Sequence, residues 1–227
     1  GIALGYLHTN LIEAGGASGS LDTPRLAVYG TYALGNLAVD ATAGYAYDFI
    51  DSSRPFANLG QTASSSYNGQ EANAAIQVST RANFAGITFM PAAGLAFVHV
   101  AQNGVSENGA PGFNLNVNGN SANSLRTFVG LTAAKSYTTD GGMVITPEAD
   151  IAYSYETLNT TPPSLIQVGG GSFTVPGLMP SRSQLILGGG ITAQLTDALA
   201  FEAAYHITPP TGNLLSQTIS LGLDYRF

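Results

Sequence analysis

The C-terminal stretch Gln217-Thr-Ile-Ser-Leu-Gly-Leu-Asp-Tyr-Arg-Phe227 decides the fold class of this chain. Apolar residues occupy every second position from Ile219 to Phe227, and the residues between them are small or polar. A period of two places these two sets on opposite faces of a β-strand. The last strand of a soluble sandwich alternates in the same way. However, an apolar outer face over a polar inner face is also the repeating unit of a transmembrane β-barrel.

The composition favours the barrel. Only 9% of the residues are charged, whereas soluble domains usually contain roughly 25%. Apolar residues make up 44% of the chain, yet they are dispersed, and no stretch approaches the ~18–20 uninterrupted apolar residues of a transmembrane helix. The chain has no cysteine, which excludes a disulfide scaffold and a thiolate zinc site. Its net charge of −7 leaves no basic stripe, so we expect no nucleic-acid partner.

The same alternation recurs along the whole chain. Between Met143 and Glu156, for example, Ile145 and Ile151 share one face while Glu148 and Asp150 share the other. The ten segments that alternate in this way are 1–8, 24–33, 36–48, 72–84, 86–100, 122–135, 143–157, 183–195, 198–208 and 215–227. Most of them reach the ~9–11 residues that a tilted strand needs to cross a bilayer. We therefore predict an all-β fold in one domain, residues 1–227: a transmembrane, antiparallel, up-and-down β-barrel with ten strands visible here.

The connections between these segments alternate in length. Residues 9–23, 49–71, 101–121 and 158–182 form long connections, whereas 34–35, the break near 85, 136–142 and 195–198 are short, and 209–214 is intermediate. Outer-membrane barrels have short periplasmic turns and long extracellular loops. The pattern predicts a location in the bacterial outer membrane, with both ends of the sequence on the periplasmic side and the long segments as surface loops.

A search for reactive residues gives little. The three histidines, His8, His99 and His206, fall on separate strands without ligand spacing, and we expect no metal and no cofactor. Glu148 and Asp150 share a face with Glu156, which is open to two interpretations. They are either a carboxylate pair for acid–base hydrolysis, or part of a hydrated lumen wall paired with arginines on other strands. The second interpretation is favoured, because a polar lumen is what such a barrel requires, and we predict no catalytic residue.

Several short stretches, in their order along the chain, resemble the translocator β-domain of autotransporters, the proteins of type V secretion. The stretches are Gly1–Tyr6, Leu26–Tyr32, Val39–Tyr45, Met90–Leu95 followed by Glu107–Ala110, Ser124–Arg126 with Gly130, Leu195–Leu199 and Tyr225–Phe227. The resemblance implies an outer-membrane barrel, not an enzyme, that anchors an N-terminal passenger and helps to translocate it to the cell surface. The alternative is a self-standing ten-stranded outer-membrane protein that acts as a small pore, an adhesin or a hydrolase.

The resemblance also implies a larger domain. The family barrel has twelve strands, preceded by an α-helix that threads the pore and joins the passenger. Gly1 falls where the third of those strands would begin. We therefore expect an N-terminally incomplete barrel, since two missing strands would leave unpaired edges in lipid. A relative that closes with ten strands is the other possibility.

The candidate residues follow from the resemblance and from the alternation of faces. Leu223, Tyr225 and Phe227 resemble the terminal signal that the outer-membrane assembly machinery recognises. The candidates for lining the lumen are Asp40, Arg81, Arg126, Glu148, Asp150, Glu202, Asp224 and Arg226. The expected partners are outer-membrane lipid, the assembly machinery, and the protein's own passenger with its linker helix.

Overall fold

A computed structural model describes the chain except for residues 159–163, 176–180, 211–214 and 227. Its main body is one antiparallel sheet whose long strands follow one another in chain order. The long strands are β1 (Ile2–Ile12), β2 (Ser18–Leu34), β3 (Leu37–Phe56), β4 (Gln61–Thr80), β6 (Ile87–Gln102), β9 (Asn120–Ala134), β11 (Val144–Glu156), β14 (Ser183–Gln194), β15 (Leu199–Thr208) and β16 (Ser216–Tyr225). The predicted all-β, up-and-down antiparallel fold is confirmed.

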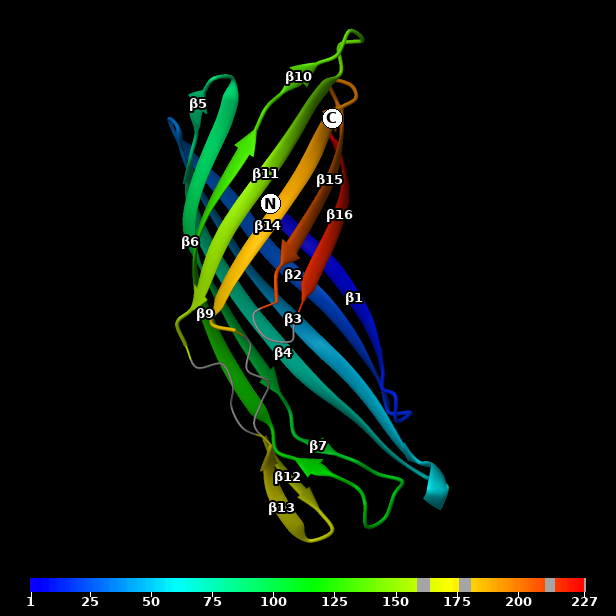
Figure 1. Ribbon diagram of the computed structural model, residues 1–227. Helices are drawn as coiled ribbons and strands as arrows, with labels where there is room; N and C mark the ends of the chain where they lie inside the picture. Colours follow the sequence, from blue (N-terminus) through cyan, green and yellow to red (C-terminus); the bar gives the residue numbers. More distant parts are fainter. Residues whose placement is uncertain (159–163, 176–180, 211–214, 227) are drawn as a thin grey trace.

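The sheet is strongly curled, and its strands run diagonally (Figure 1). Side chains from one face of five strands, among them Gln77, Met90, Thr132, Asp150 and His206, line a single cavity of about 380 Å³. Residues on five strands can share one cavity only if that face of the sheet is concave. We call this concave face the lumen face. It carries the even-numbered residues of β3 and of every long strand from β6 to β16, and the odd-numbered residues of β1, β2 and β4.

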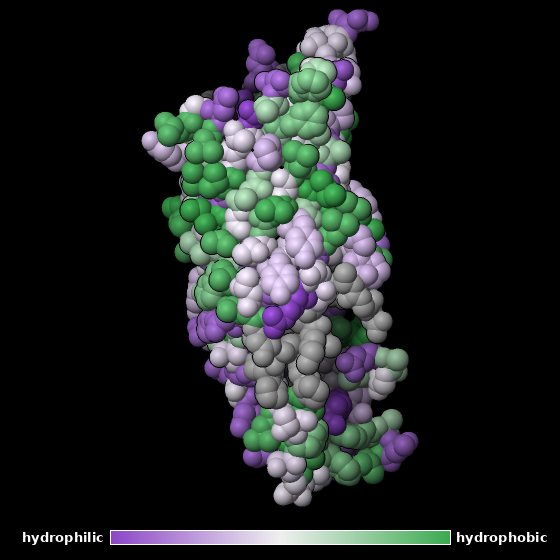
Figure 2. All heavy atoms as spheres, turned by 60° about the vertical axis from the view of Figure 1, so that its left-hand side comes forward, coloured by the Kyte–Doolittle hydropathy of each residue, from purple (hydrophilic) through white to green (hydrophobic). Residues whose placement is uncertain are grey.

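The convex face is apolar and open. Leu4 is 83% exposed, and Leu221 in β16 is 73% exposed. Aliphatic and aromatic residues recur at every second position of the intervening strands, as the alternation predicts. Figure 2 shows apolar residues gathered in a wide band across the upper part of the molecule, with paler and more hydrophilic residues below it. Such a surface is stable only when lipid or another apolar partner covers it.

Short connections gather at the end of the sheet that is uppermost in Figure 1. The β2–β3 turn is Gly35-Asn36, in which Gly35 has φ 59°. The small strand β5 (Ala82–Phe84) turns back into β6 through Ala85 and Gly86, which both have positive φ, and β10 (Tyr137–Thr138) pairs with the start of β11. A left-handed residue suits a tight hairpin between twisted strands.

At the opposite end the strands are longer than the sequence suggested. The predicted loops at 9–23 and 49–71 are wrong, because β1 continues to Ile12, β2 begins at Ser18, and the pairing of β3 with β4 extends as far as Phe56 and Gln61. A short 3₁₀ helix, η1 (Ala57–Leu59), closes the β3–β4 hairpin. Serine-rich segments read as loops by composition, but here their hydroxyls pair across strands, as between Ser52 and Ser65 at 2.8 Å.

The two remaining long connections are not simple loops either. They contribute β7 (Val105–Ser106), β8 (Asn116–Val117), β12 (Ser164–Val168) and β13 (Gly171–Val175), which form a second, four-stranded sheet in the order β13-β12-β8-β7. This sheet lies at the lower end in Figure 1. Two backbone hydrogen bonds between Ser64 and Asn108 attach it to β4. Two connections that lie far apart in the chain therefore form one ordered sheet. Its strands are too short for an alternating pattern to be recognised in the sequence.

The strand order of the main sheet is open, with β1 at one end and β16 at the other. Among the described residues, none forms a helix of the length and apolarity that a membrane-spanning helix requires.

Candidate functional site

The candidate site is the lumen face, which is built from rows of side chains that cross the strands. Residues paired in register share a face, so each pairing places a side chain beside the next one in its row. One such row runs from Asp150 on β11 through Gly188 on β14 to His206 on β15 and Thr218 on β16. The rows bring together residues that lie tens of positions apart in the sequence.

The side chains of Asp150 and His206 meet across a strand that lies between them. Asp150 Oδ1 lies 3.3 Å from His206 Nε2, although β14 separates their strands. The gap can be bridged because Gly188 has no side chain. A Cβ atom there would lie 2.4 Å from both Asp150 Oδ1 and His206 Cδ2. The missing side chain at Gly188 therefore leaves the space in which the two side chains meet.

Glu148 has a similar setting one row away. Its carboxylate leans over Gly190, where a Cβ atom would lie 2.9 Å from Glu148 Oε1. Glu202 stands beside Gly222 on the neighbouring strand. The glycines of β14 thus make room on the lumen face for the carboxylates of β11.

An enclosed polar cluster on this face centres on Glu156, whose side chain is 2% exposed. Its carboxylate accepts hydrogen bonds from the Ser124 hydroxyl, from Leu125 N at 2.9 Å and from Leu158 N at 3.0 Å. Arg126 Nε lies 3.4 Å from Glu156 Oε2. A buried carboxylate is tolerated when it is paired and hydrogen-bonded in this way. Glu156 was placed on the polar face by its spacing, but its partners depend on the pairing of β9 with β11.

The wall formed by β2, β3 and β4 carries further polar pairs. Asp40 accepts a hydrogen bond of 2.6 Å from Thr31, and Asp48 accepts one of 2.6 Å from the fully buried Thr23. Arg25 Nη2 lies 3.7 Å from Glu71 Oε2. Arg25, Asp48 and Glu71 are not among the predicted lumen candidates. The alternation places Asp48 on the same polar face as Asp40, and Arg25 falls on a predicted strand, whereas Glu71 falls within the predicted loop 49–71.

The remaining predicted lumen residues lie toward the end with the short turns. Asp224 is on the lumen face of β16, and its Oδ1 is 3.5 Å from Arg226 Nε. Arg81 lies between β4 and β5, where its backbone N–H donates to Asn36 O at 3.2 Å. Leu223 and Tyr225 lie on the convex face and are 74% and 65% exposed, while Phe227 lies outside the described residues.

The other two histidines lie on the convex face. His8 Nδ1 is 2.7 Å from Asp22 Oδ1, and His99 Nδ1 is 2.8 Å from Asn123 Oδ1. Within the part of the chain that the structure describes, no three His, Cys, Asp or Glu side chains are grouped so that they could hold a metal ion. What the lumen face offers is a hydrated wall of carboxylates, hydroxyls and amides, which can solvate and contact a polypeptide.

An antiparallel sheet, curled around a polar concave face and apolar on its convex face, defines a transmembrane β-barrel protein of the outer-membrane type. The sequence model of the Autotransporter beta-domain family matches residues 1–206. This chain therefore belongs to the autotransporter β-domain family. Membership makes it an outer-membrane β-barrel that transports a passenger.

Other proteins resemble this chain in sequence or in fold. An extracellular serine protease from Serratia marcescens is 25% identical over 231 residues, which cover 100% of this chain and 22% of that protein. The chain thus spans 22% of the length of that relative. The translocator domain of the autotransporter NalP from Neisseria meningitidis superposes with a TM-score of 0.77 and 17% identity, over 100% of this chain and 74% of that one. The β domain of the Bordetella autotransporter BrkA gives a TM-score of 0.70 and 15% identity, over 99% and 81%.

Proposed function

We propose that the lumen face of residues 1–227, acting as one domain, forms the passage along which an N-terminal passenger travels to the cell surface, and that the segment linking passenger to barrel stays beside this face. The observation that carries the proposal is the polar concave face, which continues across the sheet from Asp40 on β3 to Asp224 on β16. A polypeptide in transit has unpaired backbone groups, and a hydrated wall lets them keep their water.

Within this proposal, Asp40, Arg126, Glu148, Asp150, Glu202 and Asp224 line the passage, with Arg81 and Arg226 near its periplasmic end. The exposed convex face, of which Leu221 is typical, is covered by outer-membrane lipid. The passenger moves passively, because the lumen supplies hydration and room but no chemical step.

Neighbouring residues on β16 provide the test, since Ser220 faces the lumen and Leu221 faces outwards. In the full-length protein, a bulky water-soluble maleimide should react with Ser220→Cys and block the passenger from reaching the cell surface. This chain contains no cysteine of its own. Leu221→Cys should be unreactive to the same reagent and should leave surface passenger at its normal level. Equal reactivity and equal transport in the two variants would reject the lumen as the passage.

We infer that the end of the chain also carries an assembly signal, made by Leu223, Tyr225 and Phe227. Support comes from the position of β16 at the end of the strand order, with Leu223 and Tyr225 on its convex face. A strand at the end of a sheet can add to a sheet of the assembly machinery by β-augmentation.

A further inference from the structure

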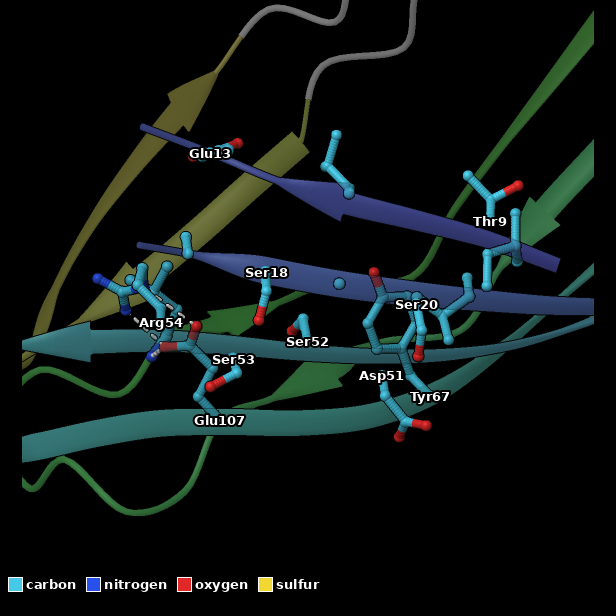
Figure 3. A pocket seen from close by; sticks show the side chains of 16 residues that line it. Thr9, Glu13, Ser18, Ser20, Asp51, Ser52, Ser53, Arg54, Tyr67 and Glu107 are labelled. Carbon is cyan, nitrogen blue, oxygen red and sulfur yellow. Dashed lines mark hydrogen bonds and ion pairs between the residues drawn. The ribbon is translucent and has the colours of Figure 1, made fainter. Parts of the chain in front are cut away.

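An apolar groove interrupts the polar lumen face at its extracellular end. Four side chains that are paired in register, Thr9, Leu21, Ile50 and Tyr67, form a row across β1, β2, β3 and β4. This row lines a cavity of about 520 Å³ together with Leu115, which comes from the connection between β6 and β9 (Figure 3). Leu11 lies one row further out on β1 and also lines the cavity.

Polar side chains predominate beyond this groove. The next lumen row toward the membrane contains Leu7 together with Thr23, Asp48 and Gly69, and the row beyond it contains Arg25 and Glu71. Because the groove faces the lumen, the bilayer around the barrel cannot cover it. Leu21, Ile50 and Tyr67 are only partly buried, so the groove still offers apolar surface to a partner inside the lumen.

The groove is held in shape by charged and polar contacts at its outer end. Arg54 Nη2 lies 2.6 Å from Glu107 Oε2 and 3.1 Å from Phe113 O, and Glu107 accepts a hydrogen bond of 2.8 Å from Leu115 N. The Glu107 side chain is only 10% exposed. These bonds fix Leu115 as a wall of the groove, and Figure 3 shows the Arg54–Glu107 pair at one end of it and Tyr67 towards the other. A preformed apolar site loses little entropy when a partner enters it.

We propose that this groove binds apolar side chains of the segment that links the passenger to the barrel, at the point where that segment leaves the lumen. The inference rests on the proposed function, which places the segment beside the lumen face. It assigns a chemistry to the segment: aliphatic or aromatic residues at its extracellular end and basic residues nearer the periplasm.

Charge complementarity supports this choice of occupant. Toward the periplasmic side, the lumen face carries Glu148 and Glu202, and no arginine or lysine lies within ion-pairing distance of either among the described residues. A segment with lysine or arginine beside these carboxylates, followed by apolar residues beside Ile50, would satisfy both parts of the wall. A lipid or a second copy of the barrel would match the apolar groove alone.

The test uses adjacent residues on β3 that face opposite ways, Ile50 toward the lumen and Phe49 away from it. In the full-length protein, Ile50→Cys is expected to form a disulfide with single cysteines scanned through the linking segment, and Phe49→Cys is not. A second variant, Ile50→Asn, should raise the rate at which external protease cleaves that segment by about tenfold or more, since one buried aliphatic side chain is worth at least that factor. Ile50→Val should behave like the parent.

Each outcome bears on a definite claim. Folding of every variant is checked first by its heat-dependent mobility in detergent electrophoresis. Equal cross-linking at positions 49 and 50, or cross-links between two barrels at position 50, would overturn the proposed occupant. If labelled Ser220→Cys blocks transport as expected but Ile50→Cys forms no cross-link with the linking segment, the proposed passage is retained and the proposed binding groove is rejected. If Ser220→Cys has no effect on transport either, the proposed function itself has failed.

Discussion

Removing the carboxylate of Glu156 should destabilise the barrel more than any other single change on the lumen face. Glu156→Ala removes the carboxylate partner of the Arg126 guanidinium, which keeps its longer contacts to Ser154 Oγ and Ser181 O. It also removes the acceptor of the Ser124 hydroxyl and of the N–H groups of Leu125 and Leu158. Breaking a buried ion pair by deleting one partner costs about 3–5 kcal/mol. Glu156→Gln keeps one acceptor oxygen but leaves a donor of the cluster without an acceptor, and it should cost about 1–3 kcal/mol, the penalty for an unsatisfied buried polar group.

The measurement is the free energy of unfolding in urea, with the purified full-length protein folded into lipid vesicles. Glu148→Gln is the matched control, because Glu148 lies on the same strand and face yet remains half-buried over a glycine. The control should change the free energy of unfolding by no more than about 0.5 kcal/mol. If Glu156→Ala were as mild as Glu148→Gln, the hydrogen bonds around Glu156 would not hold β9 to β11, and the reasoning would be refuted.

Three further predictions concern the two faces of the sheet and its end. Leu221→Arg should destabilise the folded protein in vesicles by about 2–4 kcal/mol if the residue lies near the bilayer midplane, whereas Ser220→Arg on the lumen face should not; the reverse order would exchange the faces. Gly188→Ala should cost about 1–3 kcal/mol, because its Cβ atom overlaps the carboxylate and the imidazole that meet there, while Gly189→Ala on the convex face is the mild control. Deleting Phe227 should reduce surface-assembled protein in cells far more than it lowers the melting temperature in detergent, and equal losses would leave it a packing residue.

The fold class could be predicted because the barrel repeats one physical rule in every strand. Each position must suit either lipid or water, so the alternation from Ile219 to Tyr225 and that around Ile151 carry the same information. The short turns could also be predicted from the sequence, because Gly35 and Gly86 supply the positive φ that tight hairpins need. The strand ends between 9 and 23 and between 49 and 71 could not be predicted, because apolar and polar residues no longer alternate there.

Above the membrane both faces of a hairpin meet water, so polar residues no longer alternate with apolar ones. The parts of β3 and β4 next to their connecting hairpin, toward the lower end in Figure 1, therefore read as loops in the sequence, although Ser52 and Ser65 pair across them. The small sheet of β7, β8, β12 and β13 was hidden for another reason. Its strands are only two to five residues long, and the pairing that joins its two halves, β8 with β12, links two separate connections.

The interior contacts show what register adds to alternation. Alternation places Asp150 and His206 on the same face, but only the pairing of β11 with β14 and of β14 with β15 puts Gly188 between them. A convex-face residue needs only to be apolar, so many side chains serve there equally well. The identity of a lumen-face residue is constrained by the other residues in its row, because a glycine on one strand leaves space that a side chain from another strand occupies. Substitutions on the lumen face should therefore be coupled in pairs along a row, whereas those on the convex face should act singly.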